Sequence, residues 1–140
     1  MITVETASPK GRVLIMDDEE LICDILLQAL SRSGYEVCSS SNGAEAIELY
    51  RLAKQTGRPF HALIIDLCIK NGMDGLETIS RLIDIDPDVK AIVISGSPDH
   101  PVMLNHGSYG FSGILPKPFL LEKLRAELDK IMQQQRGRYS

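Results

Sequence analysis

The sequence has few cysteines, no long apolar run and no basic run, and each shortage excludes a class of protein. Three cysteines among 140 residues are an odd number without CxxC spacing, which predicts buried or half-buried free thiols in a reducing compartment. No apolar run approaches the ~18 residues of a membrane span, and the opening stretch lacks an apolar signal core. A net charge of −4 gives no electrostatic reason for direct nucleic acid binding. We therefore expect a cytoplasmic protein that binds neither membrane nor nucleic acid.

The length and composition fit one ordinary domain. The chain is 44% hydrophobic and 24% charged, which is enough apolar material for a single packed core. There is no internal repeat, low-complexity segment or linker. We divide the chain into a flexible leader (1–10), one folded domain (11–132) and a flexible tail (133–140).

Short apolar runs alternate with stretches whose apolar residues recur at helical spacing. The runs predict strands at 12–17, 35–39, 61–66, 89–95 and 112–115. The helical patterns begin near positions 21, 43, 76, 98 and 121, and the pattern over 98–106 is the weakest. Five continuous apolar strands alternating with five helices predict an α/β fold with a parallel sheet covered on both faces.

Polar side chains stand where these strands end. Asp17 and Asp18 follow the first strand, Asp66 ends the third, Ser95 ends the fourth, and the fifth runs into Lys117. In open α/β sheets, ligands bind beyond the carboxyl ends of the strands. Taken singly, each residue has an ordinary explanation as a helix cap, a turn or an exposed loop. Because all of these residues lie at strand ends, we expect them to form one site.

The charges at this edge call for a cation. Two carboxylates ~4 Å apart repel by about 4 kcal/mol at an effective dielectric constant near 20. Three carboxylates and one lysine leave a formal charge of −2, which a divalent ion would neutralise. Oxygen ligands favour Mg²⁺ or Mn²⁺. Such a site suits phosphoryl transfer to Asp66, with Lys117 and the metal stabilising the transferred charge.

Four separated segments resemble the receiver domains of two-component response regulators, over roughly residues 11–132. They are Val13–Glu19, Leu63–Leu67, Ile92–Gly96 and Leu115–Phe119. The resemblance implies a flavodoxin-like (βα)5 doubly wound parallel sheet with strand order 2-1-3-4-5.

The resemblance also implies roles for the site residues. Asp66 matches the phosphoacceptor, Asp18 a direct Mg²⁺ ligand, and Asp17 a ligand that acts largely through water. Cys68 takes the position that binds the metal through its backbone carbonyl. The metal set is then Asp17, Asp18, Asp66 and Cys68.

Two further residues match the family's switch. Ser95 matches the switch hydroxyl, and Lys117 matches the family's lysine, whose bond to Pro118 is usually cis. The domain would take a phosphoryl group from a phosphohistidine of a histidine kinase or phosphotransfer protein, and would switch binding of a downstream partner. It would catalyse only its own phosphorylation and dephosphorylation.

The sequence departs from the family pattern in two places. The loop after Asp66 carries one extra residue before Gly75, and Lys70 replaces the usual proline. Ile114 takes the place of the usual switch aromatic in the fifth strand. The longer loop and the segment Tyr109–Gly113 resemble receivers attached to hybrid histidine kinases.

Other functions stay open. A pseudo-receiver would bind partners without phosphorylation, and the altered loop favours that reading. A flavin-binding electron carrier would share the strand order, but the acidic run Asp17–Glu20 would repel a flavin phosphate. A haloacid dehalogenase-type hydrolase would need a second Asp at position 68, where Cys68 stands. The outer face of the last helix is a candidate partner or homodimer surface.

Overall fold

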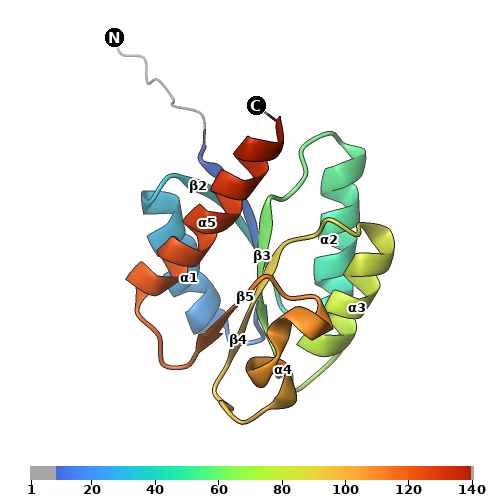
Figure 1. Cartoon of the computed structure of the whole chain (residues 1–140), viewed down its shortest axis with the longest axis vertical. Coiled ribbons are helices and arrows are strands. Elements are labelled where there is room, and N and C mark those ends of the chain that lie inside the picture. The colour runs from blue at the N-terminus through green and yellow to red at the C-terminus, as the bar shows by residue number, and fades with distance from the viewer. Residues whose placement is uncertain (1–8, 140) are drawn as a thin grey trace.

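The computed structural model describes residues 9–139, which form one five-stranded parallel sheet with helices on both faces (Figure 1). The strand order is β2-β1-β3-β4-β5, as the resemblance implied. The strands are β1 (Gly11–Met16), β2 (Tyr35–Ser40), β3 (Ala62–Asp66), β4 (Ala91–Ser95) and β5 (Gly113–Pro116). The helices are α1 (Glu20–Arg32), α2 (Gly43–Gln55), α3 (Gly75–Ile85), α4 (Pro101–Leu104), the 3-10 turn η1 (His106–Tyr109) and α5 (Leu121–Tyr139).

The inner strands β1, β3 and β4 are buried because helices cover both faces of the sheet, and successive side chains point to these two faces in turn. Val13 and Ile15 of β1 belong to the core beneath α1 and α5. Leu14 and Met16 belong to the core beneath α2, α3 and α4. Figure 1 shows α1 and α5 on one side of the sheet, with α2 and α3 on the other. This double burial explains the unbroken apolar strands of the sequence.

The helices α2 and α3 both begin at side-chain caps that the sequence supplies. Asn42 Oδ1 accepts the N–H of Glu45 at 3.0 Å at the start of α2. Asp74 Oδ1 accepts the N–H of Glu77 at 3.0 Å at the start of α3. Such caps satisfy backbone donors that have no partner within the helix.

The fourth helical segment is shorter than the sequence pattern predicted. In place of one helix over 98–106, α4 spans only Pro101–Leu104, and η1 follows it. His100 Nδ1 caps α4 by accepting the N–H of Val102 at 3.1 Å. Pro101 suits the first position of the helix, and Asn105 ends it by leaving the helical conformation, with φ of −149° and ψ of 57°. Gly110, in a left-handed conformation with φ of 96°, ends η1.

The last helix is longer than predicted. It continues through the segment 133–139 that we expected to be a flexible tail. Met132 of α5 is buried against the sheet, and three residues further on the Gln135 side chain donates to the carbonyl oxygen of His61 at 2.6 Å. These contacts hold the helix against the sheet beyond the predicted boundary.

The leader predicted over 1–10 falls mostly outside the described residues, which begin at position 9. Lys10 belongs to the fold, because its N–H donates to the carbonyl oxygen of Gly34 at 2.8 Å. None of the described helices is both long enough and apolar enough to cross a membrane.

Candidate functional site

The sheet places all the predicted site residues at its carboxyl edge. Asp17 and Asp18 follow the last residue of β1, and Asp66 is the last residue of β3. Ser95 ends β4, and Lys117 follows β5 directly. Parallel pairing in register brings these strand ends together.

The three carboxylates form a compact cluster. One oxygen from each of Asp17, Asp18 and Asp66 lies within 4.8 Å of the others. Asp17 and Asp66 are buried, with 4% and 6% of their surface exposed, and Asp18 is half-buried. Lys117 Nζ lies 3.4 Å from Asp66 Oδ2. The prediction that these residues meet is confirmed.

Backbone N–H groups hold each carboxylate in place. Each of the three aspartates accepts one such bond, and each donor lies in a loop that follows β1 or β3. The bonds run from Glu19 to Asp17 (2.9 Å), from Cys68 to Asp66 (3.3 Å) and from Lys70 to Asp18 (3.0 Å).

Burial makes the negative charges costly. Burial raises the pKa of Asp17 to about 6, the Asp66 charge adds to the rise, and the Glu19 N–H and the Lys117 ammonium oppose it. Burial also raises the pKa of Asp66, against the opposing effects of Lys117 and the Cys68 N–H. The three carboxylates and one ammonium carry a formal charge of −2. Clustered oxygen donors with this charge fit a divalent ion such as Mg²⁺.

Ser95 and Lys117 lie on neighbouring strands. Ser95 is buried, and its hydroxyl oxygen accepts the N–H of Ser97 at 3.0 Å. The N–H of Lys117 donates to the carbonyl oxygen of Ser95 at 2.8 Å. The Lys117–Pro118 peptide bond is cis, as the resemblance implied.

The family model for the response regulator receiver domain matches residues 13–129. This chain belongs to that family. It is 33% identical over 121 residues to the response regulator receiver protein CpdR of Brucella abortus, covering 86% of this chain and 96% of CpdR. It is 28% identical over 128 residues to the sensor kinase CckA of the same organism, covering 91% of this chain but only 13% of CckA. The response regulator TrrA of Thermotoga maritima, solved with Mg²⁺ and BeF, has the same fold, with 24% identity and a TM-score of 0.70 over 86% of this chain and 98% of TrrA.

The receiver domain's β3–α3 loop depends on close packing at Gly75. A Cβ atom there would lie 2.7 Å from the carbonyl oxygen of Asp66 and 2.9 Å from Leu67 Cα. The N–H of Gly75 also donates to the carbonyl oxygen of Leu67 at 3.1 Å. The sequence marked Gly75 only through its spacing in the family pattern, and the structure gives the reason for the glycine.

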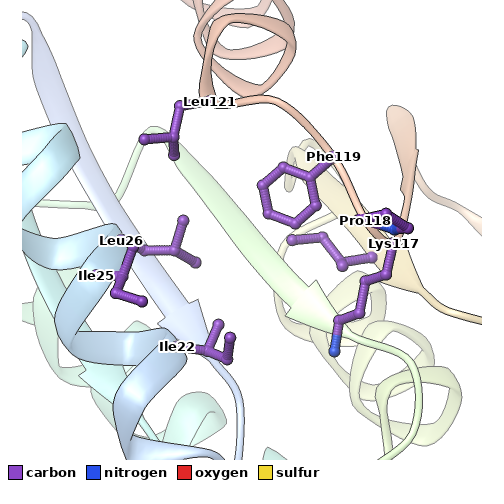
Figure 2. Close-up of a pocket in the computed structure, with 8 residues that line it drawn as sticks. Ile22, Ile25, Leu26, Lys117, Pro118, Phe119 and Leu121 are labelled. Carbon is purple, nitrogen blue, oxygen red and sulfur yellow. The ribbon is translucent and has the colours of Figure 1, made fainter.

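An apolar groove borders the site, and the sequence reasoning missed it. The groove measures about 530 Å³ and lies between α1 and the β5–α5 loop. Figure 2 shows Ile22, Ile25 and Leu26 of α1 on one side, Phe119 on the other, and the Lys117 amino group at the end of β3. The adjacent apolar pairs along α1 form a stripe wider than one buried face needs, which is a signal that the sequence does contain.

Two predictions about single residues have different outcomes. The described cysteines are free thiols, as expected, but Cys68 is exposed rather than half-buried because it lies in the β3–α3 loop. Ile114 takes its predicted place in β5 and packs, half-buried, against the core beneath α2, α3 and α4. The role of the Cys68 carbonyl as a metal ligand stays a prediction.

Proposed function

We propose that this receiver domain accepts a phosphoryl group on Asp66 in a two-component phosphorelay, with Mg²⁺ bound by the acidic cluster. The observation that carries the proposal is the Asp66 carboxylate, which lies beside the Lys117 ammonium at 3.4 Å and within 4.8 Å of Asp17 and Asp18 oxygens. Family membership and the Mg²⁺–BeF complex of TrrA support it.

The chemistry is an in-line displacement on phosphorus. An Asp66 oxygen forms the new P–O bond while the P–N bond of a phosphohistidine breaks, and the electron pair of the broken bond stays on the imidazole nitrogen. Lys117 binds a phosphoryl oxygen. Among the described residues, the Ser95 hydroxyl donates to no acceptor. It can therefore donate a hydrogen bond to a second phosphoryl oxygen. Mg²⁺ would be held by Asp17, Asp18, Asp66 and the Cys68 carbonyl, and would supply positive charge for the transfer.

The domain acts only on its own phosphoryl group. The donor is a histidine kinase or a phosphotransfer protein, and the phosphorylated form binds a downstream partner. The apolar groove along α1 gives a protein donor a contact surface next to Lys117, and Ile25 is 48% exposed there.

Incubation with acetyl phosphate and Mg²⁺, followed by intact mass measurement, tests the proposal. The wild-type protein should gain one phosphoryl group, and Asp66→Asn should gain none. Asp84→Asn, an exposed carboxylate on α3, is the matched control and should be labelled like wild type. Equal labelling of Asp66→Asn would place the acceptor elsewhere.

An unlabelled wild type would instead support the pseudo-receiver alternative, in which partners bind without phosphorylation. Omitting Mg²⁺ should abolish labelling of the wild type. Labelling that persists in excess chelator would contradict the role of the metal.

A further inference from the structure

The β3–α3 loop brings the backbone of a second lysine to the acidic cluster. Lys70 follows Asp66 by four residues, and its backbone N–H donates to Asp18 Oδ2 at 3.0 Å. That bond places the start of the Lys70 side chain next to a carboxylate whose oxygen lies within 4.8 Å of Asp66. The four-carbon stem of a lysine spans such a separation easily.

Lys70 also lies on the solvent-exposed side of the site. Asp17 and Asp66 are buried, Asp18 is half-buried, and Lys70 is exposed, so exposure increases from the acceptor toward Lys70. An incoming phosphodonor must approach from the solvent. Among the side chains of residues 9–135, the Lys70 ammonium forms no ion pair. Its charge is therefore free to act on an anion that enters the site.

The negative charge of the acidic cluster points to a function for Lys70. Three carboxylates and Lys117 leave a formal charge of −2, and a phosphodonor is itself an anion. We propose that Lys70 is a second functional cation of the site, which draws the anionic phosphodonor to Asp66 and lowers the affinity of the cluster for Mg²⁺. This inference rests on the proposed phosphoacceptor function, and its Mg²⁺ arm can be tested without phosphorylation.

Three variants test the proposal. Lys70→Gln removes the charge, Lys70→Arg keeps it, and Lys130→Gln removes an equal charge from the exposed face of α5. At low salt, phosphorylation of Lys70→Gln by acetyl phosphate should be about two- to fivefold slower than wild type. The difference should shrink at high salt, because screening weakens the attraction. Lys70→Arg and Lys130→Gln should stay close to wild type.

Isothermal titration with Mg²⁺ alone gives the second readout. Lys70→Gln should bind Mg²⁺ about two- to fivefold more tightly than wild type, because a competing cation is gone. An unchanged phosphorylation rate, a Lys70→Arg variant as slow as Lys70→Gln, or weaker Mg²⁺ binding by Lys70→Gln would each overturn the proposal. If the wild type takes no phosphoryl group, the proposed function fails. The Mg²⁺ titration then still shows whether the Lys70 charge weakens Mg²⁺ binding to the cluster.

Discussion

Replacing Asp17 with asparagine should make the metal-free protein more stable, although it removes a residue of the site. Asp17 is buried beside Asp66, and these surroundings raise its pKa from the ordinary 3.8 to about 6. The charged form of Asp17 is therefore less favourable in the folded protein than in the unfolded chain. Asparagine lacks the charge, and its carbonyl oxygen can still accept the N–H of Glu19.

The sign and size of this stability change follow from the pKa values of Asp17 in the folded and unfolded states. Because the folded value is higher, protonation of Asp17 favours folding. The stability that protonation of Asp17 contributes is fully present below about pH 4 and is lost as the pH rises through about 6. A rise from 3.8 to about 6 corresponds to about 3 kcal/mol above pH 6, since a tenfold change in equilibrium is about 1.4 kcal/mol. Asp17→Asn should gain up to that amount, and its urea midpoint should rise by roughly 1–3 M.

Urea unfolding in chelator, at a pH above 6 and again near 4, measures the effect. The advantage of Asp17→Asn should be large at the higher pH and close to zero at the lower one. Asp84→Asn, which changes an exposed carboxylate, should match wild type at both. Mg²⁺ at a hundredfold excess over its dissociation constant should stabilise wild type by about 2.7 kcal/mol and Asp17→Asn by less. An Asp17→Asn variant no more stable than wild type above pH 6, or an advantage that persists near pH 4, would refute the reasoning.

Three further predictions concern other parts of the site. Gly75→Ala should lower the free energy of unfolding by about 1–3 kcal/mol in chemical denaturation, because its Cβ would meet the Asp66 carbonyl; an unchanged stability would contradict the close packing. Ile25→Asp should slow transfer from any phosphohistidine protein that labels wild type, while labelling by acetyl phosphate stays unchanged; equal loss with both donors would argue against a docking role for the groove. Iodoacetamide should label exposed Cys68 well before buried Cys23, whose thiol pKa burial raises to about 11, and peptide mass mapping showing the reverse order would exclude this assignment.

The sheet and the site could be predicted from the sequence because both depend on strong local signals. A strand buried on both faces is a continuous apolar run, so each strand end could be located within a residue or two. Parallel strands bring their carboxyl ends to one edge, and this alone placed Asp17, Asp66 and Lys117 together. Neither step needed knowledge of side-chain packing.

The remaining features depend on contacts between distant segments. The last turns of α5 are attached to the sheet by the bond from Gln135 to His61, which are 74 positions apart. The short α4 is the exception, because its limits are local: Pro101 takes its first position and Asn105 leaves the helical conformation. The apolar groove exists because α1 and the β5–α5 loop stay apart, and periodicity along one helix cannot show that separation.

The attachment of Gln135 determines where this domain can be trimmed. A fragment ending at residue 132, the boundary suggested by the apolar pattern, would lose the final turns of α5 and leave the His61 carbonyl oxygen without that donor. Excising the domain for expression, or fusing it to another protein, should therefore keep the chain at least through Gln135.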